Sequence, residues 1–207
     1  SAKKYWHFIK VMGRSASHVA LECALETQPN ICLIGEEVAA KKMSLAQITN
    51  YIADAVETRG NNGENFGVAI IPEGIVEFVP EFSALIAEIN ELLAGEKTAA
   101  FNALPDWNAK YDFIKAGLSA DAFKVFDILP QGIQQQLFLE RDPHGNVQVS
   151  LIESEKLFSE MVKNELAKRK EAGTYKGKFG AQHLFSGYEG RCAFPSNFDA
   201  DYFYSLR

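Results

Sequence analysis

The sequence has few cysteines and histidines, and those it has are widely spaced. Cys23, Cys32 and Cys192 are odd in number and form no C-x-x-C pair, so neither a disulfide framework nor a zinc knot is indicated. The four histidines lack metal-ligand spacing as well. We therefore expect no metal site within these residues and a reducing compartment, for which the cytoplasm fits best.

The sequence also lacks an excess of positive charge and any long apolar run. The chain has 21 lysines and arginines and 27 acidic residues, whereas binding a nucleic-acid backbone needs a basic surface. No segment is apolar for long enough to cross a bilayer, and none has the charged start and apolar core of a signal peptide. Neither nucleic acid nor a membrane is expected as a partner, and any anion site must be built locally.

The two ends of the chain lack the usual start and stop signals. The sequence begins at Ser1 without a methionine, and the aromatic-rich helical pattern at residues 201–207 has no glycine or proline after it. We expect a piece cut from a longer protein. Its 207 residues, 47% of them hydrophobic, still suffice for one domain, or a domain with an insertion, around its own core.

Apolar runs alternate with helical patterns in the first part of the chain. The runs have strand length and occupy residues 4–12, 30–35 and 66–71. The helical patterns occupy residues 15–27, 44–60 and 80–95, and the second begins with a capping box at Ser44 and Gln47. Strands without polar alternation that are separated by helices favour a parallel sheet. The sequence predicts an α/β fold with a doubly wound, mostly parallel sheet and helices on both faces.

From residue 96 the alternation breaks. Short helical patterns at 101–139 are punctuated by prolines and glycines, residues 147–152 are strand-like, and 153–170 form a charged amphipathic helix. A last strand at 182–187 and a closing helix after Pro195 follow. We expect three parts: an α/β part at 1–95, a mainly helical insertion at 96–172, and a return to the α/β domain at 173–207.

Three expected strand ends carry similar residues, namely Met12-Gly13-Arg14, Pro72-Glu73-Gly74 and Tyr188-Glu189-Gly190-Arg191. In an open α/β sheet such turns converge on one ligand crevice. Glycine admits a ligand close to the backbone, arginine supplies a fixed charged fork, and helix N-termini favour anions, so the combination suits a phosphate ester. A glutamate accepts hydrogen bonds from sugar hydroxyls. An isolated arginine after a strand more often pairs with a surface acid, but the recurrence indicates a phosphosugar site.

At these residues the sequence closely resembles the long-form pyrophosphate-dependent phosphofructokinases, the pyrophosphate:fructose-6-phosphate 1-phosphotransferases. The resemblance covers essentially the whole chain, in the order of the family's motifs. The matching stretches are Lys4-Tyr5, residues 12–18, Pro72-Glu73-Gly74, residues 139–150 and residues 187–201.

The resemblance implies a role for each matching residue. Fructose 6-phosphate would be bound by Met12, Gly13, Arg14, Glu73, Tyr188, Glu189, Gly190 and Arg191, which makes residues 1–95 the sugar-phosphate-binding part. Arg14 would be the catalytic residue beside the transferring phosphoryl group, where a fixed positive charge stabilises the transition state. Lys4 and Tyr5 would reach the sugar phosphate of a neighbouring subunit, so a homo-oligomer with a shared site is expected.

Two motifs of this family are missing from these residues. The Thr-Ile-Asp motif, which carries the general base, and the Gly-Gly-Asp-Asp motif, which contacts magnesium and pyrophosphate, do not occur. The resemblance therefore implies the sugar-binding portion of an enzyme that moves phosphoryl reversibly between pyrophosphate and the C1 hydroxyl of fructose 6-phosphate, giving fructose 1,6-bisphosphate in glycolysis or gluconeogenesis. Mg²⁺ would be bound outside this chain, and the chain alone would be inactive. The alternative is a sugar-phosphate-binding regulatory subunit without catalysis.

Overall fold

The computed structural model describes residues 4–94, 97–139 and 146–187. The strands are β1 (Trp6–Val11), β2 (Ile31–Cys32), β3 (Gly67–Pro72) and β4 (Ala181–Ser186). The helices are α1 (His18–Thr27), α2 (Gly35–Ala40), α3 (Leu45–Asn61), α4 (Pro80–Leu92), α5 (Lys97–Asn102), α6 (Trp107–Gly117), α7 (Ala120–Ile128), α8 (Gln131–Leu139) and α9 (Ser154–Glu171). Two short 3-10 turns are η1 (Ile75–Phe78) and η2 (Val149–Leu151).

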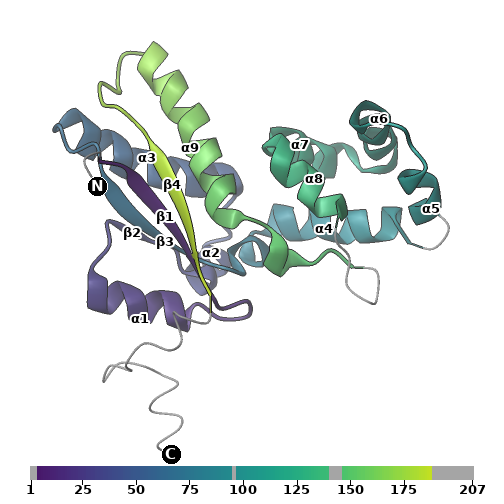
Figure 1. Cartoon of the computed structure of the whole chain (residues 1–207), viewed down its shortest axis with the longest axis horizontal. Helices are drawn as coiled ribbons and strands as arrows, with labels where there is room; N and C mark the ends of the chain where they lie inside the picture. Colours follow the sequence, from purple (N-terminus) through teal and green to yellow (C-terminus); the bar gives the residue numbers. More distant parts are fainter. Residues whose placement is uncertain (1–3, 95–96, 140–145, 188–207) are drawn as a thin grey trace, which may run out of the picture. The chain divides into compact units, whose positions relative to one another are not determined.

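Within the described residues, the strands form one parallel sheet in the order β2-β3-β1-β4 (Figure 1). The path from β1 to β2 runs toward one edge of the sheet, and the later crossovers run toward the other. Because parallel crossovers are right-handed, this reversal puts α1 on one face and α3 with α9 on the opposite face. The predicted doubly wound α/β fold is confirmed.

The alternation of side chains along β1 serves both faces of the sheet. Ile9 and Val11 pack against Ala20 of α1 in one apolar cluster. Lys10 points to the other face, where its Nζ lies 3.7 Å from Glu155 Oε2 at the start of α9. The capping box predicted at the start of α3 is present, since Ser44 and Gln47 exchange side-chain and backbone hydrogen bonds.

Helix α9 is held on α3 by one arginine. Arg169 Nη1 donates to Asp54 and Glu57 at 2.7 Å each, and its Nε donates to Glu165 at 3.2 Å. Burial by itself lowers the pKa of Arg169, but the hydrogen bonds to these carboxylates outweigh it and raise the pKa above its ordinary value. Helices α3 and α9 consequently lie side by side on the sheet (Figure 1).

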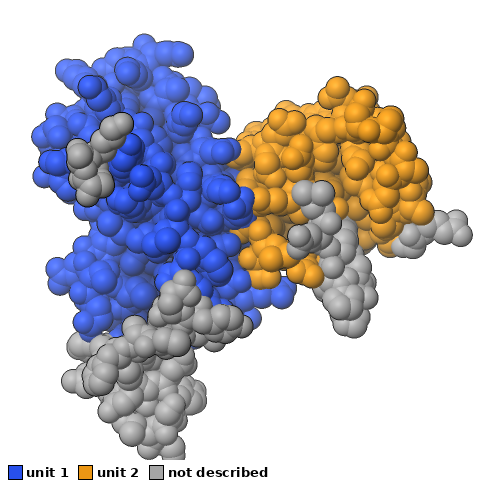
Figure 2. All heavy atoms as spheres, in the orientation of Figure 1, with its two compact units in different colours: residues 1–79, 153–207 blue, residues 80–152 orange. Residues whose placement is uncertain are grey.

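The chain divides into two compact units (Figure 2). Unit 1 comprises residues 1–79 and 153–207, and unit 2 comprises residues 80–152. The sequence pattern put the boundaries at 95 and 172 instead, whereas α4 is grouped with unit 2 and α9 with unit 1, because α9 contacts β1, β4 and α3. The expected partition into a sugar-binding part and an insertion concerns function, which this division does not test, and it stays a prediction.

Unit 2 is built from short helices around aromatic side chains. Phe138 of α8 lies 5.1 Å from Phe101 of α5 and 5.8 Å from Phe126 of α7, measured between ring centroids. Helix α4 also packs against α7. These contacts give a set of short helices a common core, although no single one of them has the length to be stable alone.

Three parts of the structure differ from the sequence pattern or lie beyond it. Helix α2 and the turn η1 were not predicted, because both are short and lack a capping signature. The strand-like segment at 147–152 is a correction: Val147 makes only an isolated bridge, and η2 follows it. Val147, Val149 and Ile152 are buried while Leu151 is exposed, and no neighbouring strand among the described residues continues the pairing. The closing helix after Pro195 lies outside the described residues.

Candidate functional site

The carboxyl ends of three strands lie at one level of the sheet. Val11, the last residue of β1, pairs in register with Pro72 of β3 and with Ser186 of β4. The chain therefore leaves these strands side by side, as the ligand-binding edge of an open α/β sheet requires. We call residues 12–14 the β1 loop and residues 73–74 the β3 loop.

The β1 loop and the β3 loop are joined through their backbones. The N–H of Glu73 donates to the Val11 carbonyl at 2.9 Å, and the N–H of Gly74 donates to the Gly13 carbonyl at 3.1 Å. A Cβ on Gly74 would lie 1.8 Å from the Arg14 carbonyl oxygen, so only glycine permits this approach. The N–H of Gly74 serves the contact between the loops, which is a different role from the ligand contact that the sequence suggested.

Gly13 is required for a second reason. Its φ of +130° lies in a region that residues with a Cβ avoid. A Cβ there would also lie 2.7 Å from the Ala16 carbonyl oxygen. The glycine thus lets the chain turn sharply from β1 toward α1 and places Arg14 at the outside of the turn.

The start of α1 is tied to the start of α2. Ser17 is almost fully buried, and its Oγ accepts a hydrogen bond from the Gly35 N–H at 2.8 Å. In return, the Ser17 N–H donates to Glu36 Oε1 at 2.9 Å. The hydroxyl makes no capping bond to its own helix, so the pair of bonds fixes the chain just after the β1 loop.

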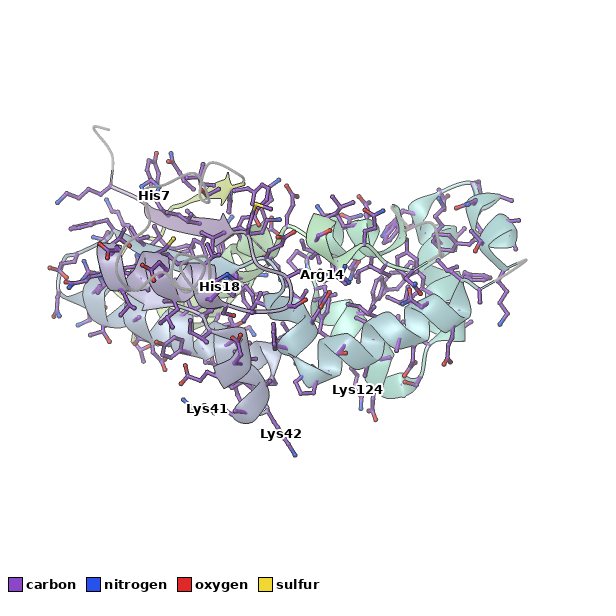
Figure 3. All side chains as sticks on the ribbon, turned by 90° about the horizontal axis from the view of Figure 1, so that it is seen from below. His7, Arg14, His18, Lys41, Lys42 and Lys124 are labelled. Carbon is purple, nitrogen blue, oxygen red and sulfur yellow. The ribbon has the colours of Figure 1, made fainter. Side chains whose placement is uncertain are left out.

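The charge of Glu36 is stabilised by this tie. Burial acts to raise the pKa of Glu36, but the hydrogen bonds from Ser17 and the nearby His18 lower it below its ordinary value. His18 begins α1, and Arg14 lies on the loop before that helix (Figure 3). Glu36 is therefore a carboxylate at neutral pH, and the bonds that anchor α1 persist there.

Arg14 is exposed and forms one ion pair. Its Nε lies 2.7 Å from Oε1 of Glu77 on η1, and the two side chains are 58% and 31% exposed. This is the surface pairing that an arginine after a strand most often makes. Because the bond uses Nε, the terminal Nη1 and Nη2 fork has no partner among the described residues. The fork can bind an anion in two-point fashion.

The structure brings four of the predicted site residues together. Met12 and Glu73 are half-buried, Gly13 is buried and Arg14 is exposed, all at the carboxyl edge of the sheet. Within the described part of the chain, no hydrogen bond or ion pair involves the Glu73 carboxylate. Tyr188, Glu189, Gly190 and Arg191 lie outside the described residues.

Lys4 and Tyr5 do not lie with the other predicted residues. They precede β1, whose six residues separate them from the β1 loop by about 20 Å at roughly 3.3 Å per residue. Lys4 Nζ lies 4.6 Å from the centroid of the Phe66 ring. The Tyr5 carbonyl accepts from the Gly67 N–H. A role for this pair at the same site therefore needs a second subunit.

Sequence reasoning missed three residues that shape this edge: Ser17, Glu36 and Glu77. A charged Glu77 inside the apolar segment Ile75-Val76-Glu77-Phe78 is a signal that the sequence could have given. No comparable signal marks Ser17 and Glu36, because their tie depends on the tertiary packing of α1 beside α2. Among the residues that the structure describes, no three potential ligands gather as a metal site would require.

The arrangement can hold a phosphorylated polyol at the carboxyl edge. A guanidinium fork suits phosphate oxygens, and an unpaired carboxylate accepts hydroxyl hydrogen bonds. The described residues supply neither a metal site nor an activated nucleophile beside Arg14. The edge is therefore equipped for binding and charge stabilisation, and proton transfer needs other residues.

Comparison with known proteins agrees with this chemistry. The parallel sheet with helices on both faces is that of an α/β protein with a phosphofructokinase-like fold. No family model matches the chain. Over its full length, however, it is homologous to part of the proteins named pyrophosphate--fructose 6-phosphate 1-phosphotransferase.

Three relatives illustrate the extent of the similarity. The chain is 56% identical to the protein of that name from Treponema pallidum over 206 residues, which are 100% of this chain and 36% of the relative. It is 54% identical to that of Entamoeba histolytica, with 100% and 37% covered. It is 53% identical to subunit beta 1 of Arabidopsis thaliana, with 100% and 35% covered. The chain thus spans about a third of the length of these relatives.

The joining of the two loops predicts the effect of replacing Gly74. Gly74→Ala brings a methyl group into the space of the Arg14 carbonyl, and we expect the free energy of unfolding to fall by about 2 kcal/mol or more. Urea denaturation of the chain measures this change. Gly132→Ala is the matched control, because a Cβ at Gly132 in α8 meets nothing within 4 Å. Equal denaturation midpoints for Gly74→Ala and the unmodified chain would contradict the contact.

Proposed function

We propose that this chain is the fructose-6-phosphate-binding portion of a pyrophosphate-dependent 6-phosphofructokinase. The complete enzyme transfers a phosphoryl group reversibly from pyrophosphate to the C1 hydroxyl of fructose 6-phosphate, giving fructose 1,6-bisphosphate in glycolysis or gluconeogenesis. The observation that carries the proposal is the backbone joining of the β1 loop to the β3 loop, which puts Arg14 and Glu73 at one edge of the sheet. The names of the homologous proteins support it.

Each described residue of the site has a distinct role in this proposal. Arg14 faces the transferring phosphoryl group, where its fixed charge offsets the negative charge that spreads over the equatorial oxygens. Glu73 accepts hydrogen bonds from the sugar hydroxyls and so orients the ring. Met12 and Gly13 form the turn that presents Arg14.

The remaining residues complete the sugar site from elsewhere. Tyr188, Glu189, Gly190 and Arg191 hold the sugar and its 6-phosphate, and the in-register pairing of Ser186 with Val11 supports this, since β4 ends beside the β1 loop. Lys4 and Tyr5 serve the site of a neighbouring subunit, so the enzyme is a homo-oligomer. Plant relatives are named as alpha and beta subunits, which suggests that those proteins assemble as oligomers.

The catalytic groups that this chain lacks belong to another part of the enzyme. The described residues do not fit a Mg²⁺ site, because they offer no gathered set of carboxylate ligands and Glu77 is already paired with Arg14. In this proposal Mg²⁺, pyrophosphate and the general base are held outside this chain, because the two motifs that would supply them do not occur in its sequence. We place the enzyme in the cytoplasm, because its few, widely spaced cysteines fit a reducing compartment. No described helix is long and apolar enough to cross a membrane.

A regulatory subunit without catalysis is the alternative function. The relatives from Treponema, Entamoeba and Arabidopsis carry the names of phosphotransferases, so this alternative is not favoured. Retention of Arg14 also speaks for catalysis, because a protein that only binds sugar phosphate needs no charge beside the transferring group.

Because the proposal places the general base and the pyrophosphate site outside this chain, we predict that the chain alone has no activity. A coupled assay with pyrophosphate, Mg²⁺ and fructose 6-phosphate is expected to detect no turnover by these 207 residues, because the base and the donor site are missing. The complete protein, assayed beside it, is the control. Measurable turnover by the chain alone would contradict the division.

The role of Arg14 predicts a specific kinetic change in the complete protein. Arg14→Ala is expected to lower kcat about 100-fold or more, with the KM for fructose 6-phosphate changed less than about threefold, since the charge acts mainly in the transition state. Lys124→Ala is the control, because it removes an exposed cation of α7 that is paired with Asp121. A raised KM with unchanged kcat would place Arg14 in substrate binding alone.

A further inference from the structure

We propose that Glu77 is the positioning residue of Arg14, an inference that rests on the proposed function. The Glu77 carboxylate is placed to act through the guanidinium of Arg14, with which it is hydrogen-bonded. The Arg14 Nε donates to Glu77 Oε1 at 2.7 Å. Among the described residues, Glu77 is the ion-pair partner of Arg14.

Glu77 lies in the turn η1, which buried side chains and a backbone hydrogen bond hold in place. Its neighbours Ile75 and Val76 are fully buried, and the Glu77 N–H donates to the Gly74 carbonyl at 2.9 Å. On the other side of Glu77, the Phe78 ring packs against Gly35, where a Cβ would lie 2.4 Å from the ring. The turn η1 is thereby fixed to the beginning of α2.

Arg14 has no comparable support of its own. Its side chain is 58% exposed, and a long arginine side chain in solvent samples many rotamers. The hydrogen bond at Nε restrains where the guanidinium lies, and because the group is planar its other nitrogens move together with Nε. Because the bond is made at Nε, the end-on pair of N–H groups on Nη1 and Nη2 stays available for a two-point grip on phosphoryl oxygens.

The position of Glu77 also connects it to the joined loops. The Gly74 N–H donates a hydrogen bond to the Gly13 carbonyl, and the Gly74 carbonyl accepts one from the Glu77 N–H. The two partners of the ion pair therefore stand on backbones that are hydrogen-bonded to each other. A preorganised charge needs no reorganisation at the moment of reaction, which is where its effect on rate comes from.

If Glu77 and Arg14 formed only an ordinary surface ion pair, removing Glu77 would not lower kcat. Exposed pairs contribute little to stability, so removal of Glu77 is expected to leave the melting temperature nearly unchanged in either case. Only positioning predicts a loss of kcat. Kinetics of the complete protein therefore separate the two roles, and the melting temperature verifies that each variant is folded.

The experiment compares Glu77→Ala, Glu77→Gln, Arg14→Ala and the double variant in the complete protein. Glu77→Ala is expected to lower kcat about 10- to 100-fold, with the KM for fructose 6-phosphate within about threefold. Glu77→Gln keeps an oxygen acceptor for Nε and is expected to recover most of this loss. Glu37→Gln is the matched control, because Glu37 of α2 forms an exposed ion pair with Lys41, the residue after that helix.

The double variant decides whether Glu77 acts through Arg14. If it does, adding Glu77→Ala to Arg14→Ala lowers kcat no further. An equal loss in both backgrounds, or an unchanged kcat for Glu77→Ala beside an impaired Arg14→Ala, would overturn the inference and leave the proposed function standing. Unimpaired turnover by Arg14→Ala would overturn the role of Arg14 and this inference together.

Discussion

The backbone contact between Gly74 and Arg14 is the constraint on which the candidate site depends. A Cβ on Gly74 would lie 1.8 Å from the Arg14 carbonyl oxygen, and two backbone hydrogen bonds join the loops at the same place. Parallel pairing of β1 with β3 brings the loops to one level, and this contact, together with the two hydrogen bonds, sets their separation. Arg14, Glu73 and Glu77 therefore take their places from the main chain, which varies less in position than exposed side chains do.

Neighbouring elements hold the backbone on both sides of this contact. On one side, Ser17 and Glu36 tie the start of α1 to the start of α2. On the other, buried Ile75 and Val76 hold the turn that carries Glu77. Arg14 is thus exposed and Glu73 and Glu77 are partly exposed, while the backbone beneath them is hydrogen-bonded. This combination suits a site that receives a soluble phosphorylated sugar and holds it in one orientation.

Much of the fold could be predicted from the sequence because its strands and longer helices carry strong periodicity. The near-continuous apolar runs of β1 and β3 and the capping box at Ser44 indicated the parallel sheet and α3. Helix α2 and η1 escaped because their stability comes from contacts such as Phe78 on Gly35, which no local pattern records. The prediction of a strand at 147–152 was wrong because a short apolar run does not distinguish a strand from a buried turn.

The candidate site was predictable to a similar degree. Glycine, arginine and glutamate at strand ends pointed to Gly13, Arg14 and Glu73, and the structure places them together. The partnership of Arg14 with Glu77 was not predictable, because it joins residues 63 positions apart in the sequence. A crystal structure of the complete protein with fructose 6-phosphate tests the account most directly. We predict that Arg14, Glu73 and Arg191 contact one sugar molecule; any of the three facing a separate pocket would contradict the account.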